Sequence, residues 1–408
     1  MSSGGRRVVV TGLGVVSALG ADRETHLEGL REGRSGIGPI VLIPTERLSV
    51  RIAAEARDFS PEGRFGRQEL ALYDRVTQIG LAAAAEAVDQ SGIGFEGEAA
   101  LRAATIIGCA MGGLHTLDDG FDTLYAQQKN RLHPFTIPRV MANATASHIS
   151  MRHGLKGPAW TVSTACSSAN HAIGQAFHLI RSGVSDRALT GGTESMLSFG
   201  GMKSWEGLRV MSRTACRPFS RNRDGMVVGE GAAILVLEEL EGAKARGAPI
   251  LGEIVGHGAS ADAGDIVAPS VDGASRAMAM ALDDAGLAPD AIGYINAHGT
   301  ATAANDRTEA AAILAVFGEH GRRIPVSSTK SMHGHPLGAA GALEAAAVLM
   351  ALGEGVVPPT INHEEADPDI PLDVVPNQAR EVRVEAALSN SVAFGGLNAV
   401  VAFRRFDG

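Results

Sequence analysis

One cysteine stands where a predicted strand passes directly into a predicted helix. Cys166 follows the β-rich run Trp160–Ser163 and precedes the helical pattern Asn170–Ser182. This placement puts the sulfur at a helix N-terminus, where unpaired backbone N–H groups and the helix dipole favour thiolate over thiol and lower the pKa. The thiolate is the nucleophilic form of cysteine. The sequence therefore predicts a nucleophile at Cys166, and the alternative is a buried cysteine that only packs.

Two histidines follow other predicted strands. His298 comes after the apolar run Ile292–Asn296, and His335 follows the run Ile324–Ser327 after a short loop. A histidine beyond the C-terminal end of a strand faces the crevice in which α/β proteins bind ligands. The alternative for His298 is a structural histidine whose ring makes internal hydrogen bonds.

The segment around His335 holds further ionisable groups. Lys330 and His333 precede His335, and Glu344 lies in the alanine-rich helical stretch that follows. His333 and His335 suggest metal ligation, but no third and fourth ligand stands at a supporting spacing, so we expect no metal. We expect instead an imidazole that donates a hydrogen bond to an oxyanion, with Lys330 and Glu344 setting its charge state and orientation.

Together these residues suit acyl transfer followed by carbanion chemistry. One thiol and two separate imidazoles come without an evident carboxylate that would orient either ring as a protease base. Cys166 would take an acyl group from a thioester, and two neutral imidazole N–H groups would hold the carbonyl oxygen of a malonyl thioester as it loses CO₂. Decarboxylation makes the carbon nucleophile without a strong base.

Strands that alternate with helices position these residues, which is typical of an α/β protein. The predicted strands are Arg7–Thr11, Ala104–Gly108, Trp160–Ser163, Ala188–Gly191, Ala232–Glu238, Ile292–Asn296, Ile324–Ser327 and Ala399–Arg404. Helical spacing of apolar residues covers Thr77–Ser91, Asn170–Ser182, Ser275–Ala285 and Ala340–Leu352. Because no Pro/Ser linker, charge block or low-complexity tract divides the chain, we expect one interlocked unit.

Composition and charge exclude several classes of protein. Of 408 residues 45% are hydrophobic and 20% charged, which excludes a largely disordered chain. With 36 basic and 45 acidic residues the net charge is −9, so we expect neither nucleic acid nor an anionic membrane as a partner. Glu344 and Glu354 interrupt the most apolar window, 339–357, so we expect no membrane span.

Cysteine usage and the N-terminus predict a cytoplasmic protein. The three cysteines have no Cys-x-x-Cys spacing, which fits a reducing compartment and neither a disulfide framework nor a zinc site. The apolar stretch Val8–Val10 is far too short for the core of a signal peptide.

Other motifs are weaker. The glycine-rich pieces do not match a dinucleotide fingerprint, and no Gly-x-Ser-x-Gly elbow occurs. The arginine cluster has two interpretations: an anionic ligand, or surface pairs with neighbours such as Asp224 and Glu230. Its members are Arg213, Arg217, Arg221 and Arg223.

The chain resembles the elongating β-ketoacyl-[acyl carrier protein] synthases, of the synthase I/II type. Matching segments occur in the family's order: Val8–Ser17, Thr164–Ser168, Pro218–Gly225, Gly229–Gly231, Asn296–Thr300, Ser328–Met332, Gly338–Gly341 and Phe394–Asn398. The resemblance implies the thiolase fold, an α/β fold of two similar halves in a five-layered α-β-α-β-α arrangement. It places the nucleophile and the cap and dimer insertions in residues 1–250, and both histidines with the gating loop in residues 251–408.

The same resemblance implies roles for the candidate catalytic residues. Cys166 matches the acylated nucleophile. His298 and His335 match the paired histidines of the decarboxylation step, and Lys330 with Glu344 matches the charged pair beside them.

Further positions match residues that bind the substrate or the carrier protein. Thr300 and Thr302 match hydroxyls that contact the phosphopantetheine arm. Phe394 matches the gating phenylalanine, whose backbone N–H joins that of Cys166 in the oxyanion hole. Met111 matches a position where side-chain size limits the length of the acyl chain. Arg67 and Arg75 match a basic patch for docking of the carrier protein, and the alternative for both is ordinary surface solvation.

The resemblance also implies the partners, and it distinguishes this chain from thiolases and from chain-length factors. It implies acyl carrier protein as the partner, no cofactor beyond the phosphopantetheine arm of that carrier, and either a homodimer or a heterodimer with a chain-length-factor-like subunit. Thiolases carry a second catalytic cysteine in the closing glycine-rich segment, which Phe394–Asn398 lacks. Chain-length factors lose the nucleophile, whereas Cys166 is present.

Some positions depart from the fatty-acid pattern. Val392, Ala393 and Leu397 stand where Phe, Gly and Thr are common. Alanine narrows the backbone freedom that glycine allows, so the gate is expected to move differently. These departures favour a specialised synthase in type II polyketide or polyene assembly. The alternatives are a housekeeping fatty-acid elongation synthase, a thiolase-like acyltransferase that does not decarboxylate, and a non-catalytic chain-length-factor-like subunit.

Overall fold

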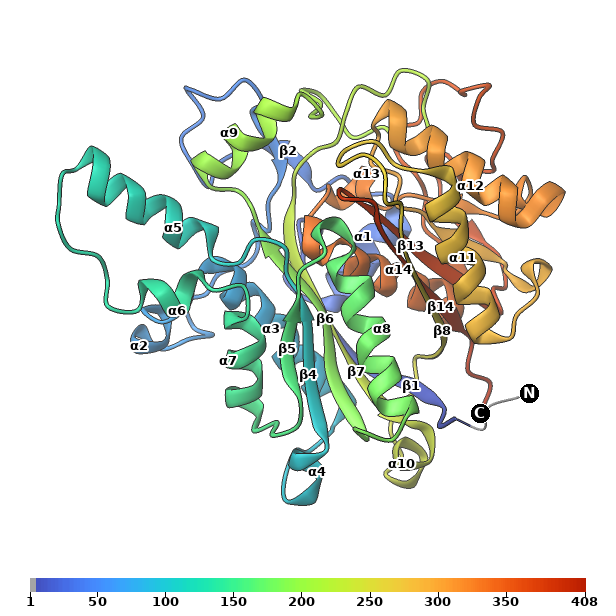
Figure 1. The fold of residues 1–408 in the computed structure, drawn as a ribbon, viewed down its shortest axis with the longest axis horizontal. Coiled ribbons are helices and arrows are strands. Elements are labelled where there is room, and N and C mark those ends of the chain that lie inside the picture. The colour runs from blue at the N-terminus through green and yellow to red at the C-terminus, as the bar shows by residue number, and fades with distance from the viewer. Residues whose placement is uncertain (1–4) are drawn as a thin grey trace.

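The computed structural model describes residues 5–408 and contains one large mixed sheet flanked by helices (Figure 1). Ten strands form this sheet in the order β10-β9-β13-β14-β8-β1-β7-β6-β4-β5. Their bounds are β1 Val8–Val16, β4 Ala103–Gly108, β5 Ala159–Val162, β6 Arg187–Ser195, β7 Glu230–Glu239, β8 Gly252–Ala261, β9 Tyr294–Asn296, β10 Val326–Ser327, β13 Ala386–Ala393 and β14 Leu397–Arg404. Short pairs are formed by β2 (Ile37–Pro39) with β3 (Ile52–Ala54) and by β11 (Val356–Val357) with β12 (Arg380–Glu381).

The sheet consists of two halves with the same strand pattern. In the N-terminal half β1 pairs antiparallel with β7, β7 antiparallel with β6, and β6, β4 and β5 run parallel. In the C-terminal half β8, β14, β13, β9 and β10 repeat these directions in the same succession. A short antiparallel contact of Val8–Val10 with 252–254 joins the halves. This matching order of strands reveals an internal duplication, which is not visible in the sequence.

Helices complete the layers on and between the two halves. The central helices α8 (Ser168–Arg181) and α14 (Ala340–Glu354) contact each other, α8 lying on β4 and β6 and α14 on β13. The outer helix α3 (Arg75–Ser91) covers β1 and β7, and α11 (Val271–Ala285) covers β8 and β14 and contacts α12 (Ala303–Gly321). Figure 1 shows α8 between the strands of the two halves. The expected five-layered arrangement follows from these contacts.

The remaining helices are shorter or lie in the connections. They are α1 Arg23–Glu32, α2 Arg67–Leu70, α4 Glu98–Leu101, α5 Leu114–Phe121, α6 Thr136–Val140, α7 Ala144–His153, α9 Phe199–Leu208, α10 Leu240–Ala245 and α13 Lys330–His333. A π-helical turn, η1 (Asp122–Ala126), continues α5, and 3₁₀ turns are η2 (Ala165–Ser167), η3 (Pro289–Ala291) and η4 (Leu337–Ala339). The segment α5–α6 projects from the body and carries exposed apolar side chains such as Tyr125 and Ile137 (Figure 1).

Helix α14 is apolar on nearly every face because it is buried in the core of the molecule. Among the described residues, Leu337–Glu354 is the one helical stretch whose length and mean hydropathy of 1.4 would fit a membrane span. It is 89% buried inside the protein. A helix that is hydrophobic all round belongs in a protein core or in a membrane, and here it packs between the two halves of the sheet.

Candidate active site

The predicted nucleophile lies in a strained turn between β5 and α8. Cys166 belongs to η2, and only 7% of its surface is exposed. Its neighbour Ala165 has φ 49°, a left-handed conformation that is costly for a residue with a Cβ. The strand-to-helix placement expected for Cys166 is therefore confirmed, with a 3₁₀ turn between strand and helix. This turn leaves the backbone N–H of Cys166 at the free N-terminal end of the helical segment.

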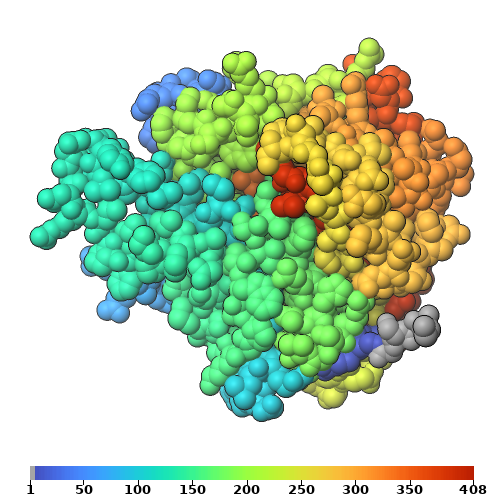
Figure 2. All heavy atoms as spheres, in the orientation of Figure 1, coloured from blue at the N-terminus to red at the C-terminus, as the bar shows by residue number. Residues whose placement is uncertain are grey.

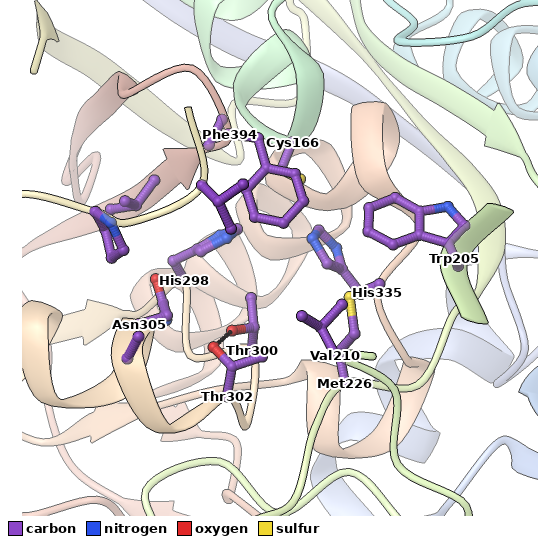
Figure 3. Close-up of a pocket in the computed structure, with 15 residues that line it drawn as sticks. Cys166, Trp205, Val210, Met226, His298, Thr300, Thr302, Asn305, His335 and Phe394 are labelled. Atoms are coloured by element: carbon purple, nitrogen blue, oxygen red, sulfur yellow. Dashed lines mark hydrogen bonds between the residues drawn. The ribbon is translucent and has the colours of Figure 1, made fainter. Parts of the chain in front are cut away.

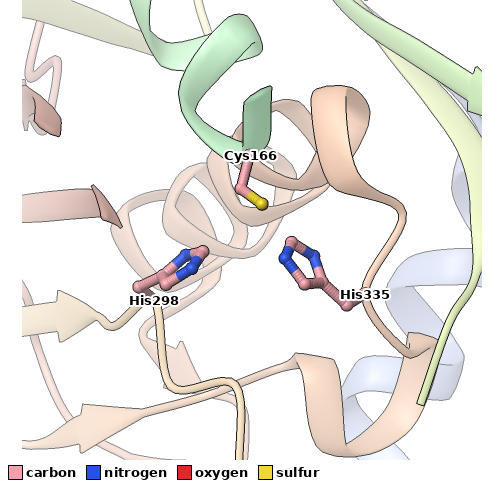
Figure 4. Close-up of side chains that lie close together, drawn as sticks. All are labelled: Cys166, His298 and His335. Atoms are coloured by element: carbon pink, nitrogen blue, oxygen red, sulfur yellow. The ribbon is translucent and has the colours of Figure 1, made fainter. Parts of the chain in front are cut away.

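Three side chains from distant parts of the chain meet at this turn (Figure 4). The Sγ atom of Cys166 and one ring nitrogen each of His298 and His335 lie within 4.8 Å of one another. The two imidazole rings stand almost perpendicular, at 82°, with centroids 5.3 Å apart. A small carbonyl group beside the sulfur would therefore face both rings.

A lysine fixes the tautomer of His298. Lys330 Nζ donates to the backbone oxygen of His298 at 2.6 Å and faces Nδ1 of the same residue at 3.3 Å. An ammonium group can only donate, so Nδ1 accepts and the ring proton sits on Nε2. Burial, together with the charge of Lys330, lowers the pKa of His298 well below its ordinary value. His298 is thus a neutral imidazole that presents an N–H group.

His335 is held from its backbone in the loop between α13 and η4. Its N–H donates to Val227 at 2.7 Å, and its oxygen accepts from the N–H of Gly229 at 3.0 Å. Burial, with Lys330 and His333 adding to the effect, lowers its pKa well below the ordinary value. Both rings at the sulfur are therefore neutral, as the chemistry of an enolate-stabilising site requires.

The geometry favours hydrogen-bond donation over metal ligation. A metal needs the lone pair of a ring nitrogen, but the tautomer that Lys330 imposes on His298 places a proton there. His333 is directed elsewhere, because its Nε2 meets Thr329 Oγ1 at 3.0 Å and its Nδ1 meets the Gly334 oxygen at 3.0 Å.

One expectation about the nucleophile is wrong for the free enzyme. Burial raises the pKa of the Cys166 thiol to about 12, an effect that Lys330 opposes, whereas the sequence pattern predicted a lowered pKa. The cause is loss of hydration at a sulfur that is nearly closed off from solvent.

Lys330 and Glu344 form a fully buried ion pair beneath the histidines. The ammonium group contacts Glu344 Oε1, and neither side chain is exposed. Burial raises the pKa of Glu344 to about 7, and Lys330 opposes this shift. The pair comes from α13 and α14, so it joins the loop of His298 to the central helix.

Two cavities meet at the sulfur. Figure 3 shows the residues that line the smaller one, among them Cys166, His298 and His335. The smaller, about 120 Å³, contains His298, His335, Thr300 and Thr302 in its wall. The larger, about 420 Å³, is lined by mainly apolar side chains: Ala110, Met111, Ala165, Met196, Leu208 and Leu337. Cys166, Trp205 and Phe394 line both cavities. The rings of Trp205 and Phe394 stack at 6.0 Å and 27°, so this pair separates the two spaces.

The loop that carries Phe394 reaches the surface in the hollow above the site. Figure 2 shows a small area of red atoms, from the chain near β13 and β14, between the green and the gold surfaces. Gly395 donates to the Ile266 oxygen at 2.8 Å, and Asp262 donates from its backbone to the Gly396 oxygen at 2.9 Å. The Phe394 loop is thus fastened to the segment before α11.

Comparison with known proteins identifies the family. Residues 5–243 match the β-ketoacyl synthase N-terminal domain, and residues 251–364 match the β-ketoacyl synthase C-terminal domain. The chain belongs to the β-ketoacyl synthase family. It is an acyltransferase of the 3-oxoacyl-[acyl-carrier-protein] synthase type with the thiolase fold, as the sequence segments predicted.

Relatives match the synthase along almost its whole length. Nodulation protein E of a Rhizobium species is 47% identical over 400 residues, which cover 98% of this chain and 99% of that protein. The 3-oxoacyl-[acyl-carrier-protein] synthase 2 of Synechocystis is 43% identical over 410 residues, with coverage of 98% and 99%.

Two solved structures are similar in fold over nearly the whole chain. The ishigamide ketosynthase/chain length factor has 40% identity and a TM-score of 0.94, with coverage of 98% of this chain and 100% of that one. AntDE:AntF, a type II polyketide acyl-carrier protein in complex with its ketosynthase, has 31% identity and a TM-score of 0.90, with coverage of 99% and 100%. Related ketosynthases thus form complexes with an acyl carrier protein and with chain-length-factor subunits.

The two predicted docking arginines of the synthase differ in their surroundings. Arg67 is exposed at the start of α2. Arg75 is 17% exposed, and its guanidinium binds both carboxylate oxygens of the fully buried Glu230, at 2.7 Å and 2.5 Å. This bidentate pair uses Nε and one Nη nitrogen of Arg75 for a contact inside the protein. The docking role of Arg67 and Arg75 stays a prediction.

The cluster of Arg213, Arg217, Arg221 and Arg223 consists mainly of ion pairs, and Arg223 is buried. Arg217 pairs with Glu364, Arg221 with Glu365 and Arg223 with Asp367. The interpretation as paired loop arginines therefore holds, with partners from the loop at 364–367 and only one of the neighbours named from the sequence, Asp224.

Sequence reasoning missed two acidic residues of α12 that shape the site. Glu309 accepts from the N–H groups of His298 and Gly299, both at 2.8 Å. Asp306 accepts from Phe219 at 2.8 Å and from Ala301, whose φ is 66°, at 3.2 Å. Burial raises the pKa of both carboxyls. The signal was present in the sequence, since both stand on one face of the helix that follows the His298 loop.

The sequence analysis also did not identify Trp205, which lines both cavities. It lies in the connection between β6 and β7, on α9, where no motif marks it. Only the fold shows that its indole packs against Phe394 beside the sulfur.

Proposed function

We propose that this synthase joins an acyl group carried on Cys166 to a malonyl unit carried on acyl carrier protein, by decarboxylative Claisen condensation. The observation that carries the proposal is the contact of Lys330 Nζ with Nδ1 of His298. It turns the Nε2–H of a neutral ring toward the space beside Cys166, where an enolate oxygen needs a hydrogen-bond donor.

In the first step the sulfur takes the acyl group. The Cys166 thiol gives up its proton, and the sulfur attacks the carbonyl carbon of the incoming thioester. The tetrahedral oxyanion accepts hydrogen bonds from the backbone N–H groups of Cys166 and Phe394, both proposed as the oxyanion hole. The carbonyl re-forms, the carrier thiolate leaves and takes up a proton, and the acyl chain extends into the larger cavity past Met111.

In the second step the malonyl thioester lies in the smaller cavity, with its phosphopantetheine arm along Thr300 and Thr302. The bond to the carboxylate breaks, CO₂ leaves, and the electron pair forms an enolate whose oxygen accepts from His298 and His335. The enolate carbon then attacks the acyl carbonyl, the new carbon–carbon bond forms, and the Cys166 thiolate leaves and is reprotonated. Lys330, paired with Glu344, keeps both rings neutral throughout.

We place the reaction in type II polyketide or polyene assembly. Val392 and Ala393 line the smaller cavity, and Leu397 packs on the apolar cluster that includes Cys166, so the departures from the fatty-acid pattern lie in the surroundings of the predicted nucleophile. The similarity to the ishigamide ketosynthase/chain length factor supports this choice. Housekeeping fatty-acid elongation is the second candidate, which the similarity to 3-oxoacyl-[acyl-carrier-protein] synthase 2 favours.

The partners follow from the same proposal. Arg67 contributes to the docking of acyl carrier protein, and the exposed apolar segment α5–α6 belongs to a homodimer or to a heterodimer with a chain-length-factor-like subunit. The three free cysteines, all buried, suit an enzyme of the reducing cytoplasm.

Intact-mass measurement after incubation with acyl-carrier protein, and again after addition of malonyl-carrier protein, tests the proposal. We expect the wild type to gain the mass of the acyl group and to lose it with release of an extended β-ketoacyl carrier. Cys166→Ala should gain no mass. Acylation of the Cys166→Ala protein would refute the assignment of the nucleophile, and a wild type that is never acylated would favour a non-catalytic subunit.

A further inference from the structure

A buried carboxylate at the end of β6 has no part in the chemistry described above. Glu194 has no exposed surface, and no cation lies within ion-pair distance of it among the described residues. Its carboxylate accepts from the backbone N–H of Ala110 at 2.7 Å and of Met111 at 3.4 Å, and from the thiol of Cys109 at 3.7 Å. Burial raises its pKa to about 7. A buried carboxylate without a cation is costly, so donors on several sides must hold it.

The second side of the carboxylate faces the turn η4. The backbone N–H of Gly338 also stabilises the charged form of Glu194. A Cβ on Gly338 would lie 2.6 Å from Glu194 Oε2 and 2.6 Å from the Ala110 nitrogen. Only glycine therefore lets the turn approach the carboxylate and the loop after β4 at the same time.

Both segments tied to Glu194 are walls of the larger cavity. Ala110 and Met111 line it from the loop after β4, and Leu337, which directly precedes Gly338, lines it from η4. Leu337 has φ 41°, a strained conformation that its surroundings must impose. Met196, two residues after Glu194, lines the same space.

We propose that Glu194 is a positioning residue that sets the acyl-chain specificity of the synthase by fixing these walls relative to Cys166. One carboxylate ties the backbone of Met111 to that of Gly338, so the width of the cavity beside the sulfur is held by an internal strut. The inference rests on the proposed role of the larger cavity as the acyl site. Glu194 does not touch the histidines' side of the sulfur, where malonyl is decarboxylated.

The variant Glu194→Gln tests the strut because an amide offers one oxygen where the carboxylate offers two. The NH₂ group of the glutamine is a donor, so it cannot accept the backbone hydrogen bonds that the replaced oxygen accepted. One of the two cavity walls therefore loses its contact with residue 194. The measurement is kcat/KM for acylation of Cys166 over a series of acyl-carrier substrates from short to long chains, beside the rate of CO₂ release from malonyl-carrier protein. We expect the preferred chain length to change, with the ratio between long and short chains shifting about tenfold, and CO₂ release to stay within about twofold of the wild type.

A matched control separates this role from a loss of stability. Glu86 on α3 also accepts two backbone N–H groups, from Val15 and Arg23 at 2.8 Å each, and lies away from both cavities. Glu86→Gln loses the same kind of contact and should keep the wild-type chain-length profile. If Glu194→Gln does not fold, Cys109→Ala removes only one donor to the carboxylate and should shift the profile in the same direction by less.

The outcomes separate this inference from the proposed function. An unchanged profile in Glu194→Gln, a uniform fall in every rate, or the same shift in Glu86→Gln would overturn the inference. Absence of acylation in the wild type itself would instead refute the acyl-enzyme proposal. A crystal structure of Glu194→Gln should show Met111 or Leu337 displaced relative to Cys166, and unmoved walls would count against the strut.

Discussion

At the scale of single residues, the site works through protonation states that burial imposes. His298 and His335 are neutral because desolvation and the nearby Lys330 oppose a second positive charge. Burial also raises the pKa of the Cys166 thiol, although Lys330 opposes that shift. Donors that are already oriented in a water-poor site need no reorganisation when charge develops, which is the main source of stabilisation for an enolate.

Replacing Lys330 tests the tautomer argument. Lys330→Met removes the donor to Nδ1 of His298, so the ring no longer keeps its proton on Nε2. Malonyl decarboxylation should fall by about 10²–10³, the usual cost of one oxyanion donor, while acylation of Cys166 persists. Release of CO₂ and intact mass measure the two steps separately. Decarboxylation at the wild-type rate would show that Lys330 does not set the tautomer.

Trp205 should act on the size of the acyl group. Trp205→Ala removes the indole that separates the two cavities with Phe394, so they join beside the sulfur. We expect bulkier acyl groups to load better relative to linear ones, measured as the ratio of their loading rates. Trp205→Phe keeps a ring at this position and should restore most of the wild-type ratio. An unaltered ratio in Trp205→Ala would contradict the role of the pair as a partition.

At the scale of elements, the two halves use the same device to bring a helix close to a strand. Gly14 of β1 lies under α3, where a Cβ would be 2.0 Å from the Ala83 oxygen. Gly258 of β8 lies under α11, where a Cβ would be 2.0 Å from the Ala277 oxygen. The absence of a side chain at both places sets the distance between sheet and helix in each half.

Alanine substitutions at a glycine under a helix and at an exposed glycine should change the free energy of unfolding by very different amounts. Gly14→Ala forces a methyl group into the backbone of α3, and we expect the free energy of unfolding to fall by about 2–3 kcal/mol. Gly353→Ala in α14 meets nothing within 4 Å and should leave stability unchanged or raise it by up to about 1 kcal/mol. Denaturant unfolding of both variants measures this, and equal effects would contradict the close packing of α3 on β1.

The elements also show where sequence patterns reach their limit. Every predicted strand lies within or overlaps an observed one, because β-branched and apolar runs dominate in them. Strands β8 and β13 were not predicted, since β8 is rich in glycine and β13 in small and polar residues. Tertiary context makes them strands: each is buried between two neighbours of the sheet.

At the scale of the whole molecule, buried neutral histidines link stability to pH. His26 is fully buried beside His333, with its Nδ1 on Ser17 at 2.7 Å, and burial lowers its pKa to about 3. Below about pH 6.5 the unfolded chain binds a proton at this residue and the folded chain does not. Stability is therefore lost as pH falls from about 6.5 toward 3, by roughly 1.4 kcal/mol per pH unit for one such group.

His26→Gln should flatten this dependence. We expect the free energy of unfolding of the variant to fall less between pH 6.5 and about 4.5, by roughly 2–3 kcal/mol less than that of the wild type. Denaturant titrations at several pH values measure the difference. Parallel pH curves for the two proteins would show that His26 titrates alike in the folded and unfolded chains.

The sequence by itself determined the family and most of the strands, and it named the candidate reactive residues. Cys166 and His298 follow the ends of strands directly, and His335 follows a strand after a short connection, so all three positions can be recognised from the local sequence. The sequence could not determine which side chains are charged or which hydrogen-bond donors are available to a partner, because both depend on neighbours far away in the chain. From the sequence, Arg75 is expected to be a surface charge, but in the fold it pairs with Glu230, which is 155 positions away in the chain. Cys166 is expected to be a thiolate, but burial raises the pKa of its thiol. Desolvation and pairing are properties of packed three-dimensional surroundings, and so only the tertiary structure decided them.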